Sequence, residues 1–249
     1  MNSPIKTFAL CVSISVSLLA NADDKIIFMG SEYPPYEYKE AGELKGFSID
    51  LLKAMQSLVK REDPVKILPW PRAYDAALNK KNHVVFSTMR APHREDLFKW
   101  VGPIYSHSTF LYRLKTRNEL SINTLEDAKI HTIGTIKGFA SEDLLIAKGF
   151  VVGENLERSR IELNAKKLLK HRIDFIITKD IVLKHILKDT IYSNIKAIFH
   201  KELPLNLNQR AYFAFNIHTD NNIINQYQTA LDSLVKSGDY QIIYSRYVD

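Results

Sequence analysis

Short apolar runs that end in polar residues, each followed by a stretch with helical features, recur along this chain and favour a layered α/β fold. In the first half, the predicted strands are Lys25–Met29, Val65–Leu68 and Val84–Phe86, with helices at Leu51–Lys60 and after Pro71. Open α/β sheets bind ligands beyond the carboxyl ends of their strands. Polar and aromatic residues that directly follow a strand are therefore the first candidates for a functional site.

The segment from Phe86 to Tyr105 contains the densest group of such residues. Ser87 and Thr88 follow the apolar strand, Arg94 comes shortly after them, and a turn is predicted at Pro103–Tyr105. Hydroxyl donors, backbone N–H groups and a guanidinium together suit an anion, most of all a carboxylate. The sequence thus predicts an anion site at this strand end. The alternative for the arginine is a solvated side chain or an ion pair with a neighbouring acid.

Aromatic residues follow the other two strands of this half. Tyr36 lies beside the stiff Pro34-Pro35 pair, and Trp70 lies close to Arg72. Flat apolar rings and a cation are expected to form one wall of a pocket for a small acidic or ring-bearing ligand. The alternatives are a packed turn for Tyr36 and a core position for Trp70.

The second half repeats the same pattern. Thr109–Lys115 and Ala211–Asn216 are predicted to cross between two α/β units. The other strands are predicted at His131–Gly134, Val151–Glu154, Arg172–Asp180 and Ile195–Phe199, and the helices at Arg160–Lys170, Ile223–Ser237 and Tyr240–Tyr247. Lys179 arrives where one strand ends.

A strand, turn and helix are predicted across Gly134–Ser141. The turn places Gly138 and Phe139 at a helix N-terminus, which favours anions. It lacks the Lys-Ser/Thr ending of a nucleotide-binding P-loop.

The N-terminus has the features of a signal peptide. Lys6 precedes an apolar stretch from Phe8 to Leu19, and Ala20-Asn21-Ala22 resembles a cleavage site. We expect residues 1–22 to be removed and the protein to be periplasmic, with an uncleaved anchor as the alternative. Cys11, the only cysteine, would leave with the peptide. The net charge of +6 is spread along the chain, and no motif for nucleic acid is present.

From residue 23 onward, the chain resembles the extracytoplasmic solute-binding proteins of family 3, the polar amino-acid group that serves ABC importers. The residues that carry this resemblance, in order, are Tyr33-Pro34-Pro35-Tyr36, Leu44–Leu51, Arg94, Phe98, Pro103-Ile104-Tyr105, Gly134–Gly138, Arg172-Ile173-Asp174 and Gly238-Asp239-Tyr240.

The resemblance implies a two-lobed periplasmic-binding-protein-like fold of type II, with two α/β lobes joined by two crossing strands. Lobe 1 would comprise 23–109 and 213–249, and lobe 2 would comprise 110–212. It also implies a monomer that closes on a small-molecule ligand and delivers it to a membrane permease, without a cofactor, a metal or catalytic residues.

The resemblance assigns Arg94 to the ligand's α-carboxylate and Ser87 to a hydroxyl beside it. Three positions depart from the family pattern. Met89 replaces a hydroxyl residue, Ala140 replaces a turn residue that often bonds the carboxylate, and Lys179 replaces the aspartate that holds an α-ammonium group. The expected ligand is therefore a carboxylate without a free α-ammonium group, unless Asp180, one residue later, replaces the missing acid. The expected ligand-binding residues are Tyr36, Trp70, Arg72, Ser87, Thr88, Arg94, Gly138, Phe139 and Lys179.

Two other functions remain open from the sequence. The first is a ligand-sensing module for a separate signalling partner. The second is an enzyme on the same scaffold, similar to cyclohexadienyl dehydratases. Against the enzyme, the chain has no Gly-x-Ser-x-Gly turn and no histidine pair with metal-ligand spacing. Glu142 is the one acid that suggests catalysis, and its alternative role is a charge in a first helical turn.

Overall fold

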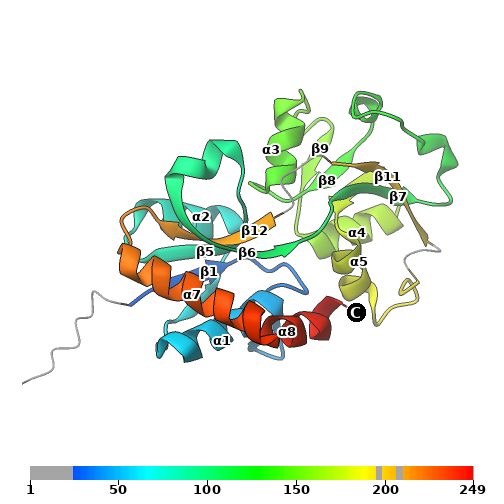
Figure 1. The fold of residues 1–249 in the computed structure, drawn as a ribbon. Coiled ribbons are helices and arrows are strands. Elements are labelled where there is room, and N and C mark those ends of the chain that lie inside the picture. Colours follow the sequence, from blue (N-terminus) through cyan, green and yellow to red (C-terminus); the bar gives the residue numbers. More distant parts are fainter. Residues whose placement is uncertain (1–24, 195–197, 206–209, 249) are drawn as a thin grey trace, which may run out of the picture.

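The structure, a computed structural model, describes residues 25–194, 198–205 and 210–248. Within these ranges the chain forms two five-stranded sheets and a small hairpin, arranged as two lobes (Figure 1). This confirms the predicted two-lobed α/β fold class. The predicted signal peptide lies outside the described residues.

The first sheet has the strand order β4-β1-β5-β12-β6. β1 is parallel to β4 and β5, whereas β12 is antiparallel to both of its neighbours. The bounds are β1 Ile27–Gly30, β4 Val65–Ile67, β5 His83–Met89, β6 Phe98–Ser106 and β12 Arg210–Asn216, with the separate hairpin β2 Tyr38–Glu40 and β3 Glu43–Lys45.

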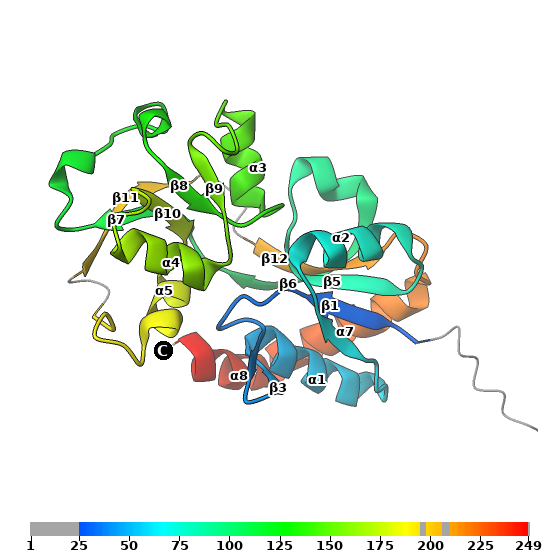
Figure 2. The same cartoon turned by 180° about the vertical axis from the view of Figure 1, so that it is seen from behind.

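Helices cover both faces of this sheet. The helices α1, α7 and α8 pack on one another across one face, and α2 covers the opposite face (Figures 1 and 2). Their bounds are α1 Phe47–Val59, α2 Trp70–Asn79, α7 Asn221–Ser237 and α8 Asp239–Val248. In the core, the ring of Phe28 meets Phe213, Phe215 and Tyr227 with centroids 6.0, 5.8 and 5.3 Å away, which are favourable edge-on contacts.

The second sheet has the order β11-β7-β10-β8-β9. β10, β8 and β9 are parallel, so their carboxyl ends share one edge, and β7 is antiparallel to β10. The bounds are β7 Phe110–Leu114, β8 Ile133–Thr135, β9 Leu156–Arg158, β10 Phe175–Thr178, β11 Phe199–Pro204, α3 Ala140–Ala147, α4 Ile161–Leu169 and α5 Asp180–Leu187, with short 3₁₀ turns η2 Pro92–Leu97, η3 Asn118–Leu120 and η4 Asp127–Ile130.

Two segments cross between the sheets, one from β6 to β7 and the other from β11 to β12. His107, on the first crossing, is hydrogen-bonded through both ring nitrogens, to the hydroxyls of Tyr36 and Tyr244, each at 2.8 Å. Burial lowers the pKa of His107 to about 4, so its imidazole is neutral near pH 7. The backbone N–H of Leu205 donates to the carbonyl of Thr109 at 2.9 Å, which joins the two crossings.

Two local predictions are wrong. The predicted strand Val151–Glu154 is a turn that contains Gly153 and follows Gly149, both with positive φ, and the strand starts later, at Leu156. The predicted turn Pro103–Tyr105 lies inside β6 instead. The proline fits there because β6 is an edge strand, where a missing N–H donor is tolerated. Of the predicted strand Ile195–Phe199, residues 195–197 lie outside the described ranges, and β11 begins at Phe199.

Candidate ligand-binding site

Two adjoining cavities lie between residues of the two lobes. The Arg94 cavity is bordered by Ser31, Glu37, Trp70, Ser87, Arg94 and Tyr105, and the Thr178 cavity by Thr109, Ile136, Ser141, Ile177 and Thr178. Tyr33, Met89, Phe139, Ala140 and Lys179 border both. Each cavity has a volume of about 30 Å³, which is room for about two water molecules. A larger ligand therefore requires the lobes to move apart.

Arg94 lies in η2, directly after β5, and is only 3% exposed. Its guanidinium reaches across to the second lobe, where Nη2 donates to the carbonyl of Gly138 at 3.2 Å and to Oδ2 of Asp143 at 2.5 Å. The guanidinium carbon also lies 5.2 Å from the ring centroid of Tyr74. The structure thus places a buried guanidinium between the lobes. Its acidic partner comes from α3 rather than from its own segment.

Glu37 is a buried acid in the Arg94 cavity that the sequence analysis did not identify. It is 1% exposed, and its Oε2 accepts a 2.6 Å hydrogen bond from Ser87 Oγ. Ser87 has a φ of 57°, unusual for a residue with a side chain, and its hydroxyl is also bonded to that of Ser48 at 2.9 Å. Burial raises the pKa of Glu37 to about 8, although the Ser87 and Ser48 hydroxyls and Lys179 oppose this change. Glu37 is therefore mostly protonated near pH 7.

Lys179 follows β10, immediately before α5, and is 7% exposed. Its Nζ lies 5.6 Å from the ring centroid of Tyr33, within the range of a cation–π contact. Burial lowers the pKa of Lys179 to about 8, while the charge of Glu37 opposes this change. A mainly cationic ammonium group thus borders both cavities near pH 7.

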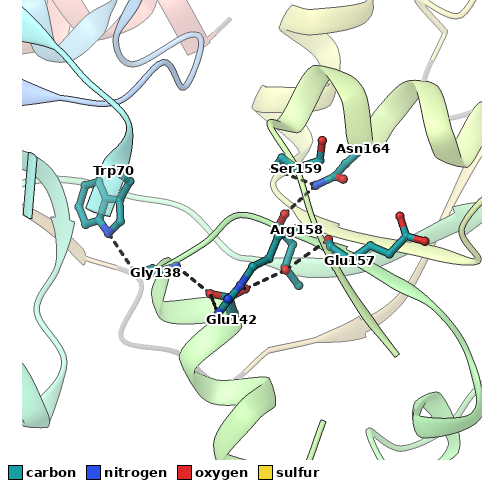
Figure 3. A network of polar contacts seen from close by, with 8 residues as sticks. Trp70, Gly138, Glu142, Glu157, Arg158, Ser159 and Asn164 are labelled. Atoms are coloured by element: carbon teal, nitrogen blue, oxygen red, sulfur yellow. Dashed lines mark hydrogen bonds and ion pairs between the residues drawn. The ribbon is translucent and has the colours of Figure 1, made fainter. Parts of the chain in front are cut away.

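Trp70 connects the lobes at the turn after β8. Its Nε1 donates to the carbonyl of Gly138 at 2.9 Å (Figure 3), and its ring lies 5.4 Å from that of Phe139. Gly138 has a φ of +78°, and a Cβ atom there would lie 3.0 Å from Trp70 Cδ1. Glycine therefore allows both the turn and the close approach of the indole ring.

Glu142 holds the same turn from within the second lobe. It is 1% exposed and accepts hydrogen bonds from Gly138 N at 2.7 Å and Arg158 Nε at 2.7 Å (Figure 3). It also accepts a hydrogen bond from Thr135 Oγ1 at 3.1 Å. From the first turn of α3, Glu142 thus holds together three groups of the second lobe, namely Gly138, Thr135 and Arg158. Because both carboxylate oxygens are occupied by neighbours, Glu142 shapes the turn, and nothing in its contacts suggests a proton-transfer role.

The structure brings together six of the nine residues expected to bind ligand: Trp70, Ser87, Arg94, Gly138, Phe139 and Lys179. Five of these six line a cavity, and Gly138 joins them through the hydrogen bonds that its carbonyl accepts from Trp70 and Arg94. The other three expected residues border neither cavity. Tyr36 is fully buried and stacks on Tyr105 with centroids 4.0 Å apart, Thr88 is buried with its hydroxyl donating to the carbonyl of Val85 at 3.2 Å, and Arg72 is exposed on α2.

The sequence analysis missed two further residues of the site, Asp143 and Thr178, in addition to Glu37. Thr178 is the last residue of β10 and directly precedes Lys179. Because open α/β sheets bind ligands at the carboxyl ends of their strands, the sequence could have identified Thr178 as a candidate. Asp143 lies in the first turn of α3, where an acid is common for local reasons, so its position gave no signal of a site.

Within the described ranges, no helix combines the length and apolarity needed to cross a bilayer. In the same part of the chain, no three His, Cys, Asp or Glu side chains are grouped so as to hold a metal ion.

Comparison with known proteins identifies the family. The model of the bacterial extracellular solute-binding proteins, family 3, matches residues 26–249. The arginine-binding extracellular protein ArtP of Bacillus subtilis (strain 168) is 27% identical over 183 residues, covering 71% of this chain and 69% of that protein.

Two solved structures share the fold at low identity. An ancestral arginine-binding protein bound to arginine has a TM-score of 0.77 and 21% identity, covering 90% of this chain and 98% of that one. A histidine kinase sensor domain with similarity to periplasmic binding proteins has a TM-score of 0.79 and 16% identity, covering 90% and 96%. Since the family model extends over nearly the whole sequence, this chain belongs to the bacterial extracellular solute-binding proteins, family 3.

Proposed function

We propose that this protein captures a small carboxylate-bearing ligand, an amino acid or a related organic acid, in the cleft between its lobes and delivers it to the membrane permease of an ABC importer. The observation that carries the proposal is the buried guanidinium of Arg94, which lines a cavity between the lobes and contacts both of them. A guanidinium binds a carboxylate through two parallel hydrogen bonds. Membership of a solute-binding family supports this role.

Within this class, we propose that the preferred ligand is an acid without a free α-ammonium group. Lys179 borders both cavities, and a cation there repels an ammonium group. Asp180 does not compensate, because it borders neither cavity and is occupied by Tyr112, whose hydroxyl donates to Oδ1 at 2.6 Å, and by Lys201. The relative ArtP is described as an arginine-binding protein. Arginine carries two cationic groups, which Lys179 would repel, so we do not propose it as the ligand of this chain.

We further propose the mode of action. The mature protein would be a periplasmic monomer beginning after Ala22, with lobe 1 formed by 23–109 and 213–249 and lobe 2 by 110–212. The lobes would open about the two crossings to admit the ligand and close on it, and the permease would bind the closed form. Contacts from Arg94 and Trp70 to the Gly138 turn support such closure, because they join the two lobes directly.

A second role, sensing for a separate signalling partner, is favoured by the fold shared with the histidine kinase sensor domain. The ligand site would be the same in both roles, so only the partner distinguishes them. An enzyme is disfavoured, because the oxygens of Glu142 are already taken by Gly138, Thr135 and Arg158.

The test is a thermal-shift screen of the secreted protein against amino acids and organic acids, followed by calorimetry on Arg94→Ala. We expect at least one carboxylate to bind and Arg94→Ala to abolish that binding. The melting temperature without ligand should stay within a few degrees, since Asp143, the partner left behind, is 35% exposed and can be hydrated. Arg172→Ala, which removes an exposed arginine, is the control. Unchanged affinity in Arg94→Ala would refute the proposal.

A further inference from the structure

We propose that the ligand is a short dicarboxylate, whose first carboxylate binds Arg94 and whose second is held by Lys179 and Thr178 in the Thr178 cavity. This inference rests on the proposed function and specifies the ligand class for the same site. It assigns a ligand-binding role to the Thr178 cavity, which the argument for Arg94 alone does not require.

The first support is the ammonium group of Lys179. The side chain is more than nine-tenths buried, yet among the described residues Nζ has no hydrogen-bond acceptor and no ion-pair partner, and it lies 5.6 Å from the centroid of the Tyr33 ring. A buried charge costs free energy unless it is paired and hydrogen-bonded. Lys179 borders both cavities, so a ligand anion in either one would supply the missing partner.

Glu37 is not the anionic partner of the Lys179 ammonium group. Its charge acts on Lys179, but in the described structure no ion pair joins the two, and the Glu37 carboxyl is bonded to Ser87 instead. Since burial also keeps Glu37 mostly protonated near pH 7, it leaves the charge of Lys179 largely uncompensated. Asp143 is likewise committed, to Arg94.

The second support is a hydroxyl group beside Lys179. Thr178 is 1% exposed, and its Oγ1, although close to the Tyr33 phenol, makes no hydrogen bond of acceptable geometry to any described residue. Buried hydroxyls without a partner are rare and costly. Ser141, in the first turn of α3, borders the same cavity, so the helix N-terminus adds a favourable potential for an anion.

The position of the two cavities favours one ligand that occupies both. They share five lining residues, including Met89 and Ala140, which are small or flexible and offer no charge between the two ends. Arg94 borders only the first cavity and Thr178 only the second, while Lys179 lies between them. This arrangement matches two acidic groups separated by a short apolar spacer.

The experiment compares matched acids by calorimetry at pH 7 on the secreted wild-type protein. Succinate, glutarate and adipate are each titrated beside the monocarboxylate of the same carbon number, namely butyrate, valerate and hexanoate. We expect one dicarboxylate to bind about 10- to 100-fold more tightly than its monocarboxylate, which is the usual size of a charge-assisted hydrogen bond. Lys179→Met should weaken binding of the dicarboxylate more than binding of its monocarboxylate, so that the two affinities come to lie within about threefold of each other. Lys236→Met, at an exposed position on α7, should change neither.

The outcomes separate this inference from the proposed function. Equal affinity of the wild type for both series, or a preference that survives Lys179→Met, overturns the dicarboxylate and leaves capture of a carboxylate by Arg94 standing. Absence of binding by every acid of both series overturns the dicarboxylate, and the proposed function is then decided by the thermal-shift screen and Arg94→Ala. If Lys179→Met does not fold, Thr178→Val takes its place, and it should reduce only dicarboxylate affinity.

Discussion

Removal of Asp143 should strengthen ligand binding. In this structure Oδ2 of Asp143 lies 2.5 Å from Nη2 of Arg94. The Arg94 guanidinium is the group that we expect to bind the ligand carboxylate. A ligand must therefore displace the protein's own carboxylate from the guanidinium before it can bind there. Asp143→Ala removes the competitor and leaves the guanidinium and the rest of the Arg94 cavity in place.

The magnitude follows from the exposure of the two partners. The Arg94 side chain is 4% exposed and that of Asp143 is 35% exposed, so the pair lies between a surface ion pair and a fully buried one. Surface pairs contribute up to about 1 kcal/mol, and hydrogen bonds to charged groups about 1.5 to 3 kcal/mol. We take about 1 to 2 kcal/mol for this pair, which corresponds to roughly 5- to 30-fold tighter binding in Asp143→Ala.

Calorimetry on wild type and Asp143→Ala, with the tightest carboxylate from the thermal-shift screen, measures this difference. Asp232→Ala, which removes an exposed acid on α7, controls for the change in net charge. Weaker binding in Asp143→Ala would refute the reasoning, because it would show that Asp143 assists the bound state rather than competing with the ligand.

Two further predictions concern the buried acids. Glu142→Ala should lower the free energy of unfolding by about 2 to 4 kcal/mol, because Gly138 N and Thr135 Oγ1 lose their acceptor; urea unfolding measures this, and a loss no larger than that of the exposed control Glu154→Ala would contradict it. The pKa of Glu37 is raised to about 8, so the folded state binds this proton more tightly than the unfolded state, and the free energy of unfolding should fall by up to about 1.4 kcal/mol per pH unit between about pH 5 and pH 8. Glu37→Gln cannot ionise and should remove this decline, whereas an identical pH profile in both proteins would show that Glu37 ionises normally.

The position of Arg94 was predictable because it depends on local rules. A polar segment after a buried parallel strand must lie at the carboxyl end of the sheet, and the structure places Arg94 there, in η2 directly after β5. The departure of Lys179 from the family pattern was visible in the same way, since Lys179 directly follows β10.

Glu37 and the strand β6 were not predictable from local rules. A glutamate in a loop that contains two prolines is ordinarily solvated, whereas Glu37 is 1% exposed and its carboxyl accepts a hydrogen bond from Ser87, which lies 50 residues later in the chain. The Gly102-Pro103 pair has the composition of a turn, and only the edge position of β6 in the assembled sheet makes a proline acceptable. In both cases the deciding contacts come from residues distant in sequence.

The hydrogen bonds of His107 limit where the proposed rotation of the lobes can take place. A neutral imidazole has one N–H, so one tyrosine hydroxyl donates to the ring and the other accepts from it, and both of these tyrosines pack in the lobe of the first sheet. The pivot of any rotation on the first crossing therefore starts after His107, and β7 begins at Phe110. Thr109, within that pivot, also borders the Thr178 cavity. A ligand bound in the Thr178 cavity would thus contact the pivot itself, where a small change in backbone torsion rotates the whole lobe of the second sheet.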